Sequence, residues 1–318
     1  MQDIGAGPSD LRSLSDVEWL AGISTLGTAE GNCRRLGHAH AALFLDRGPT
    51  LIVTFETSGA IGLRRPHGQP LGFDLAQERG WSHLCLVARG DTWFRDRAVY
   101  AYFDQLVDEA FFEEFDRVVF YGANMAGYAA AAYSATAPGA TVILAAPQAT
   151  LDPRIASWDP RFTEYRRLSF TDRYGYAPDM TEGAGDVYVI FDPEQNLDAM
   201  HAALFARAHV TLLPCRNLGR DIGRALEEMR IIRSILSAIG TGKFDATLFR
   251  TIYRARRNYI PYLQNLLARL DRDGRPLLAA LLCRSVAERL NVPAFAMRLA
   301  RLRQDLEAQG RKLPRRRR

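Results

Sequence analysis

Cysteine, lysine and long apolar runs are all scarce in this chain of 318 residues. Its four cysteines, Cys33, Cys85, Cys215 and Cys283, form no Cys-x-x-Cys pair, which excludes a zinc ribbon and a thioredoxin-type dithiol. No window holds the roughly 18 apolar residues that a bilayer crossing needs, and residues 1–10 do not begin like a secretory signal. We therefore expect reduced, buried thiols and a cytoplasmic protein without a transmembrane segment.

The formal net charge of +5 hides an asymmetry between the two parts of the chain. Residues 241–318 hold 19 Lys and Arg against 6 Asp and Glu, a net charge of +13, which leaves −8 for the preceding residues. Only Lys243 and Lys312 are lysines, so the abundance of arginine indicates a coding bias before it indicates a ligand. With 47% hydrophobic and 24% charged residues, the composition is that of an ordinary folded protein.

From residue 38 onward, short runs rich in Val, Ile, Leu and Phe alternate with stretches of helical period, which predicts a mostly parallel sheet with helices on both faces. Near-continuous apolar strands such as residues 187–191 indicate burial on both faces of the sheet. The expected strands are residues 41–45, 51–55, 84–88, 117–121, 141–145, 187–191 and 210–213. The expected helices are residues 97–112, 125–135, 198–206 and 221–239.

The pattern divides the chain into three parts. Residues 1–37 are expected to form an N-terminal helical extension, residues 38–240 the α/β domain, and residues 241–318 an arginine-rich all-α domain with a basic tail. Inside the α/β domain, residues 147–185 lose the regular period and carry several prolines and aromatic residues. Long excursions of this kind are typical of lids and binding loops.

The most informative stretch is residues 118–128, Val-Val-Phe-Tyr-Gly-Ala-Asn-Met-Ala-Gly-Tyr, in which a buried strand runs into a small-residue helix through a glycine-bounded turn. This is the local architecture of a nucleophile elbow. Together with Pro147-Gln148 after the next expected strand, it resembles the α/β-hydrolase superfamily, whose members read Gly-x-Ser-Met-Gly-Gly here. The resemblance covers about residues 40–240 and implies a hydrolase-like α/β fold.

The chemistry that this resemblance implies is absent from the matching positions. Asn124 stands where the family has its nucleophilic serine, and a carboxamide has no easily removed proton. Asp198 matches the family's acidic position better than Asp192 does, and Arg220 stands where the family has its histidine. A guanidinium stays protonated and cannot be a general base. Two of the three catalytic roles are therefore vacant.

Other side chains offer weak substitutes for the missing groups. His201 lies three residues after Asp198, so that the two would share a helix face; we read them as a surface ion pair, with His201 as the fallback base. Cys215 and Ser58 are conceivable nucleophiles, but no motif marks either one. His38 and His40 could hold a metal only with a third ligand, which the sequence does not offer. We predict neither a metal nor a cofactor.

A binding pocket could remain although the nucleophile is missing. The backbone N–H of Met125 and the turn that contains Thr57 and Ser58 match the places where the family supplies its oxyanion donors. With Asn124 and Arg220 beside them, these groups would suit a small anionic ligand such as a carboxylate, sulfate or phosphate. The alternative is a packed remnant of the cleft that binds nothing.

Three further features of the sequence bear on function. Residues 89–96, with alternating charges and two aromatics, indicate a structural set of charge pairs rather than catalysis. The general appearance of the chain also resembles phosphoadenosine phosphosulfate reductases, but the phosphate loop and C-terminal catalytic cysteine of that family are missing, which disfavours this activity. Arg250, Arg254 and Arg257 form a basic stripe, for which docking of the C-terminal segment onto its own acidic domain is favoured over nucleic acid.

The sequence thus favours a catalytically inactive α/β-hydrolase-fold protein that binds a small anionic ligand or a protein partner. The alternative is an active esterase, acyl hydrolase or acyltransferase with a non-standard catalytic set. A hydroxyl or thiol hydrogen-bonded to an imidazole at the head of the sheet would overturn the first hypothesis in favour of the second.

Overall fold

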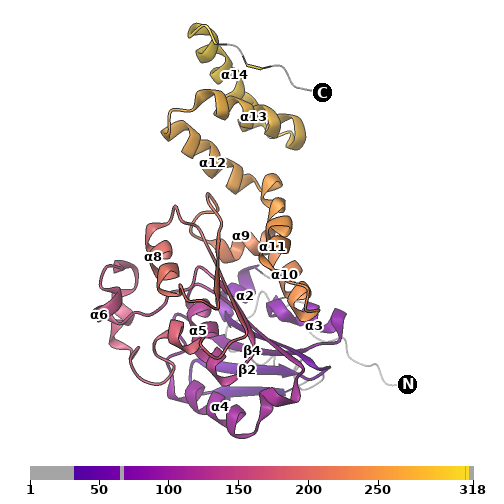
Figure 1. Cartoon of the computed structure of the whole chain (residues 1–318), viewed down its shortest axis with the longest axis vertical. Coiled ribbons are helices and arrows are strands. Elements are labelled where there is room, and N and C mark those ends of the chain that lie inside the picture. The colour runs from indigo at the N-terminus through magenta and orange to yellow at the C-terminus, as the bar shows by residue number, and fades with distance from the viewer. Residues whose placement is uncertain (1–31, 65–67, 312, 315–318) are drawn as a thin grey trace.

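The computed structural model describes residues 32–64, 68–311 and 313–314. It consists of a body, residues 32–258, built on one sheet, and a helical arm, residues 260–308, that rises from one end of the body (Figure 1). The predicted N-terminal extension lies outside the described residues up to position 31. Residues 32–36, which we expected to be part of that helical extension, form a strand instead, because they pair with the next strand of the sheet.

The sheet has eight strands in the order β1-β2-β4-β3-β5-β6-β7-β8. β1 pairs with β2 and β2 with β4 in antiparallel orientation, and every other pairing is parallel. The strands are β1 (Asn32–Leu36), β2 (His40–Leu45), β3 (Thr50–Thr57), β4 (Ser82–Ala88), β5 (Arg117–Ala123), β6 (Thr141–Ala145), β7 (Asp186–Phe191) and β8 (Val210–Pro214). We call the edge where the parallel strands end the head of the sheet.

Helices cover both faces of this sheet, so that alternate residues of each strand enter two different cores. On β3, Leu51, Val53 and Phe55 face one core, while Ile52 faces the other. The helices of the body are α2 (Ser58–Arg64), α3 (Leu71–Arg79), α4 (Arg97–Asp108), η2 (Phe111–Glu114), α5 (Met125–Tyr133), η3 (Ser134–Thr136), α6 (Pro153–Ala156), η4 (Pro160–Arg167), α7 (Ala177–Met180), α8 (Asn196–Leu204), α9 (Ile222–Glu228), α10 (Ile231–Gly240), α11 (Ala246–Ile252) and η5 (Tyr253–Asn258). The predicted class, a mostly parallel α/β sheet with helices on both faces and a helical segment after it, is confirmed.

The arm consists of α12 (Ile260–Arg272), α13 (Pro276–Leu290) and α14 (Pro293–Ala308). It has a small core of its own, in which Leu263, Cys283 and Phe295 are buried. The C-terminal segment docks onto the α/β domain only through its first part, where Phe249 and Tyr253 lie in a core of the body, while the arm rises away from the body (Figure 1). An ion pair joins the arm to the body between Arg269 and Glu194, with 3.2 Å between Nη1 and Oε1. No helix in the described ranges is long and apolar enough to span a bilayer.

Phe55 offers a test of the larger core. Its side chain is 2% exposed and its ring contacts the rings of Phe94, Phe103, Phe120 and Tyr133. Phe55→Ala should therefore lower the free energy of unfolding by about 3–5 kcal/mol, through lost burial and the cavity left behind. The measurement is urea unfolding, with Met200→Ala on the exposed face of α8 as a control expected to change stability by less than about 0.5 kcal/mol. Equal losses in the two variants would contradict the assignment of this core.

Candidate functional site

The strand-to-helix turn after β5 keeps the geometry of an elbow. Asn124 has φ 53° and ψ −123°, a conformation that few non-glycine residues adopt. Its N–H donates to the carbonyl of Ala145 and its own carbonyl accepts from the N–H of Tyr128. Gly122 permits the close approach, because a Cβ there would lie 2.0 Å from the carbonyl oxygen of Ala126. The turn thus presents a partly exposed carboxamide at the head of the sheet.

The other two predicted triad positions do not meet at this turn. Arg220 is exposed, whereas the N–H of the preceding Gly219 donates to Asp192 at 2.8 Å. Asp198 lies on α8, buried, and pairs with Arg161 of the excursion, with 2.7 Å between Nη1 and Oδ1. It is therefore Asp192, the acid that the sequence ranked second, that contacts the loop carrying Arg220.

His201 is fully buried rather than part of a surface ion pair with Asp198, so that expectation is wrong. Its Nε2 lies 3.0 Å from Oδ2 of Asp159, and its Nδ1 accepts from the N–H of Ala149 at 3.2 Å. Arg161 bridges Asp159 and Asp198. Burial would raise the pKa of Asp159, but hydrogen bonds from His201 and Arg161 outweigh it and hold that pKa below its ordinary value. Because both ring nitrogens are engaged and 0% of the side chain is exposed, His201 cannot reach a substrate in this conformation.

The remaining sequence candidates are spread over the molecule. Cys215 is buried and free, and burial raises the pKa of its thiol to about 12, so it is not a thiolate nucleophile at neutral pH. Thr57 accepts from the N–H of Ala60 at the start of α2, next to the buried Ser58. In the described part of the chain no three His, Cys, Asp or Glu side chains gather as a metal site, and His38 is exposed while His40 is buried. Whether Thr57, Ser58 and the elbow bind an anion stays a prediction.

A hydroxyl is hydrogen-bonded to an imidazole at the head of the sheet, at residues that the sequence did not single out together. Oγ1 of Thr92 lies 2.7 Å from Nε2 of His40. On the other side of the ring, Nδ1 of His40 lies 3.9 Å from Oδ2 of Asp96. His40 is the first residue of β2, and Thr92 and Asp96 belong to the connector between β4 and α4. Hydroxyl, imidazole and carboxylate thus stand in the order that nucleophilic catalysis uses, but Asp96 acts on the ring through its charge alone, because Nδ1 has no hydrogen-bond partner in the described part of the chain.

The backbone of this connector is bent to present Thr92. Trp93 and Phe94 both have positive φ, 56° and 54°, and both side chains are buried. The N–H of Phe94 donates to Oγ1 of Thr92 at 3.2 Å, while the N–H of Trp93 points to Sδ of Met125 at 3.1 Å. The connector therefore lies against the elbow, and the Thr92 oxygen accepts one hydrogen bond that would stabilise negative charge on it.

The protonation of His40 suits a base. Burial lowers the pKa of His40 below the ordinary value of 6.5, and the opposing attraction of Asp96 is the smaller effect. The ring is therefore neutral at pH 7. Because the carboxylate of Asp96 favours the proton on Nδ1, we assign the lone pair to Nε2, where it can accept the hydroxyl proton of Thr92.

Two other threonine–histidine contacts lack this accessibility. Oγ1 of Thr54 lies 2.9 Å from Nε2 of His83, but these side chains are 0% and 2% exposed. Thr181 lies 3.3 Å from His209 and is likewise fully buried. Thr92, by contrast, is partly exposed. Among these pairs in the described ranges, Thr92 with His40 is the one that a substrate could approach.

Comparisons with known proteins show a likeness of fold. No family model matches the chain, and no curated protein matches it. Among solved structures, the Gap123 glycosylation-associated protein complex of Streptococcus agalactiae has a TM-score of 0.44 at 12% identity, over 64% of this chain and 45% of that one. This chain thus spans less than half of that protein. The capsule O-acetyltransferase of Neisseria meningitidis serogroup A gives 0.41 at 13% identity, over 64% and 91% of the two chains. A putative esterase from Staphylococcus aureus gives 0.40 at 13% identity, over 74% and 97%. Because all three scores lie below 0.5, the functional conclusion rests on the geometry of the site.

The buried charge network around His201 yields a stability prediction. Arg161→Met leaves Asp159 and Asp198 buried without their shared cation, so we expect a loss of about 3–5 kcal/mol in the free energy of unfolding. Arg154→Met is the matched control, because Arg154 pairs with Asp152 while its own side chain is 73% exposed, and it should cost less than about 1 kcal/mol. Thermal or urea unfolding measures both. A small effect at Arg161 would show that this network does not hold α8 to the excursion.

Proposed function

We propose that this chain is an acyl hydrolase or acyltransferase of the α/β-hydrolase type that acts on ester bonds, with Thr92 as nucleophile and His40 as general base. The observation that carries this proposal is the 2.7 Å contact between the Thr92 hydroxyl and the His40 imidazole, with Asp96 on the far side of the ring. This activity is the alternative that the sequence suggested, an esterase, acyl hydrolase or acyltransferase, but with a different catalytic set. Asn124 at the elbow would then take part in binding and not in bond formation.

The reaction follows from the positions of the three groups. Oγ1 of Thr92 bonds to the carbonyl carbon of the ester while its proton passes to Nε2 of His40. When the ester C–O bond breaks, the leaving alcohol takes that proton and the acyl group remains on Thr92. Water or an acceptor alcohol then gives a proton to His40, attacks the acyl carbon and releases Thr92, which regains its proton. Asp96 stabilises the transient imidazolium through its charge.

A second function, binding without catalysis, is favoured by the elbow itself. Asn124 has no nucleophilic atom, and Arg220 is an exposed cation without a hydrogen bond or ion pair to the described part of the chain. A carboxylate or phosphate ligand would suit a head of the sheet that carries these two side chains. A protein that binds without catalysis would not turn over esters, so the following experiment separates the two functions.

Turnover of p-nitrophenyl esters should depend on the Thr92 hydroxyl. Thr92→Val removes the nucleophile at nearly constant volume, so kcat/KM should fall on the order of 10³-fold or more, whereas Thr92→Ser should retain turnover. The p-nitrophenyl acetate reaction, quenched early, should leave one acetyl group on the tryptic peptide that contains Thr92, as seen by mass spectrometry. A purely structural role for Thr92 would not produce that adduct.

One control makes the same Thr→Val substitution at another site, and the other changes a neighbouring histidine. Thr251→Val makes the same substitution on the exposed face of α11, where the hydroxyl bonds only to the carbonyl of Thr247. His40→Gln should abolish turnover, while His38→Gln, two residues away and exposed, should not. A wild-type protein without turnover above buffer, or acetylation only at other residues, would reject Thr92 as the nucleophile and leave the binding function.

The pH dependence of turnover should report His40. The neutral ring is the active form, so the midpoint of the acid limb of kcat/KM should lie below pH 6.5, because burial lowers the pKa of His40 below that value. Asp96 raises that pKa, so Asp96→Asn should move the acid limb to still lower pH. Asparagine can still cap α4 as Asp96 does through its bond from the N–H of Ala98. An acid limb above 6.5, or one that Asp96→Asn moves upward, would contradict His40 as the base.

A further inference from the structure

An acidic patch lies at the end of the sheet opposite the head. Residues 104–116 hold six Asp and Glu and no Lys or Arg. Asp108, Glu113, Glu114 and Asp116 are exposed, and their side chains make no hydrogen bond or ion pair within the described residues. We call these four side chains the acidic patch. Clustered like charges without counter-ions raise the energy of a lone molecule.

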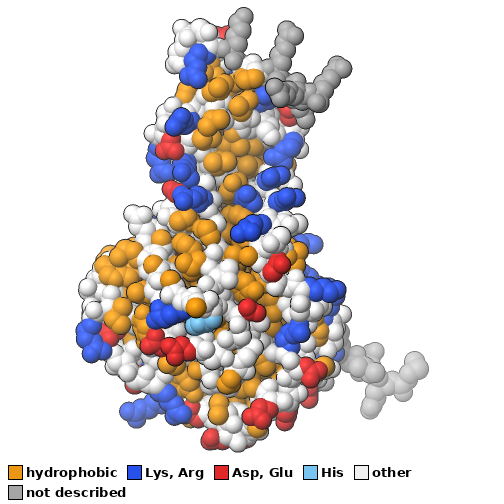
Figure 2. Space-filling view, viewed as in Figure 1, with side chains coloured by type: hydrophobic (Ala, Val, Ile, Leu, Met, Phe, Trp, Pro, Cys, Tyr) orange, Lys and Arg blue, Asp and Glu red, His pale blue; other side chains and the backbone are white. Residues whose placement is uncertain are grey.

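A basic stripe lies on the segment that leads to the arm. Residues 246–270 hold five arginines and no Asp or Glu. Arg250, Arg254 and Arg257 are exposed and, at spacings of four and three, share one side of α11 and η5; their guanidinium groups have no partner in the described part of the chain. Figure 2 shows Lys and Arg side chains along this region and acidic ones on the lower part of the body. These three arginines are the basic stripe.

A fourth cation is fixed beside the stripe. Arg289 on α13 donates to Oδ1 of Asn258 at 2.6 Å and to the carbonyl of Arg257 at 3.0 Å. Both partners are neutral, so its charge is oriented but not compensated. A guanidinium held in this way loses little freedom when a carboxylate binds it.

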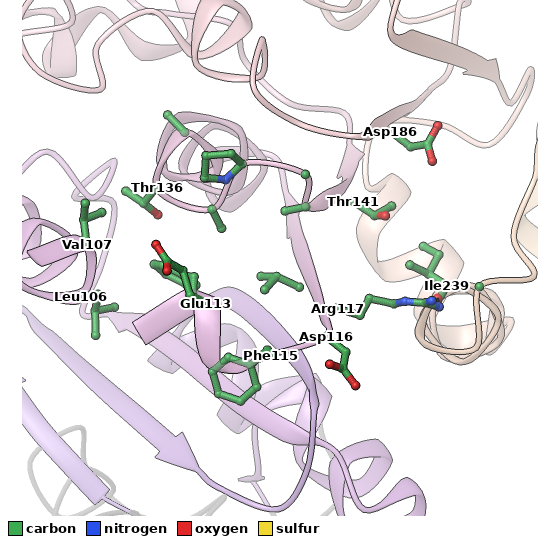
Figure 3. Close-up of a pocket in the computed structure, with 18 of the residues that line it drawn as sticks. Leu106, Val107, Glu113, Phe115, Asp116, Arg117, Thr136, Thr141, Asp186 and Ile239 are labelled. Carbon is green, nitrogen blue, oxygen red and sulfur yellow. Dashed lines mark hydrogen bonds between the residues drawn. The ribbon is translucent and has the colours of Figure 1, made fainter. Parts of the chain in front are cut away.

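A surface hollow of about 730 Å³ borders the acidic patch. Glu113 and Asp116 lie on one side of it, and Ile239, Gly242 and Phe244 on the other, only two residues before α11 begins. Figure 3 shows Glu113, Asp116, Arg117 and Asp186 around this space, with Arg117 directed toward Ile239; its Nη1 donates to the Ile239 carbonyl at 2.7 Å. The acidic patch thus borders a concave surface whose other wall is the chain just before α11, the helix that carries Arg250.

We propose that this surface binds a second copy of the same chain in a two-fold dimer, with the basic stripe of each copy on the acidic patch of the other. An acidic patch and a basic stripe on one chain can pair reciprocally with those of a second copy under a two-fold rotation, which is the symmetry of an isologous interface. A nucleic acid or an anionic lipid would account for the arginines but would leave the acidic patch unpaired. The second copy satisfies both.

Sedimentation velocity on the full chain tests this with a charge exchange. The wild type should be a dimer that dissociates as salt rises from about 0.1 M to about 1 M, where the screening length shortens from about 10 Å to about 3 Å. Reversing the stripe (Arg250→Glu, Arg254→Glu and Arg257→Glu) should give a monomer. Reversing the patch (Glu113→Arg, Glu114→Arg and Asp116→Arg) should also give a monomer. An equimolar mixture of the two should form a one-to-one dimer, because both contacts are again complementary.

The control reverses three exposed arginines elsewhere on the body, Arg35→Glu, Arg97→Glu and Arg167→Glu, with the same change in net charge; it should remain a dimer. A monomeric wild type, a dimer that both reversals leave intact, or a mixture that fails to associate would each overturn the proposal. A wild type that stays monomeric but binds an oligonucleotide or an anionic vesicle would overturn it as well. None of these outcomes depends on ester turnover, so the test is independent of the proposed function.

Discussion

The antiparallel pairing of β2 with β4 is the constraint on which the candidate site depends. His40, the first residue of β2, lies opposite Ala88, the last residue of β4, and the N–H of Arg89 continues the pairing by donating to the carbonyl of Ala39. If β2 ran parallel to β4, its first residue would lie at the end of the strands opposite the head. Because it runs in the opposite direction, the imidazole stands at the head, where the connector after β4 passes over it.

The sequence predicted the sheet much better than the site. Apolar runs identify the strands because burial on both faces leaves few polar residues in them, and the glycine-bounded turn identified the elbow. The contact of Thr92 with His40, however, joins residues 52 positions apart and depends on which strand β2 pairs with, and no local pattern encodes that choice. The same holds for His201, whose partner Asp159 comes from an excursion without regular period. The spacing of Asp198 and His201 on one helix could not show that Arg161 bridges Asp159 and Asp198.

The elbow shows that backbone geometry and chemistry are separable. Asn124 occupies a strained conformation with φ 53° and ψ −123°, and the surrounding packing maintains it. Gly223 of α9 approaches Ala123 so closely that a Cβ would lie 2.7 Å from the alanine methyl group, and a Cβ on Gly127 would lie 3.2 Å from Cα of Pro147. These contacts need small residues but no nucleophile. Retention of the elbow is therefore expected whenever the head of the sheet must stay closely packed, whichever side chain carries out the reaction.

The excursion of residues 147–185 supports the site from outside. Two successive residues with positive φ cost about 1–3 kcal/mol each, and the connector keeps them because the ring of Trp93 is enclosed by Tyr128, Phe162, Tyr165 and Phe170. Three of those four rings come from the excursion. Moving it aside as a lid would expose the indole of Trp93, now 1% exposed, and remove the packing that offsets the strain. Thr92 would then lose the bent backbone that holds its hydroxyl against His40, so a substrate must reach Thr92 with the excursion in place.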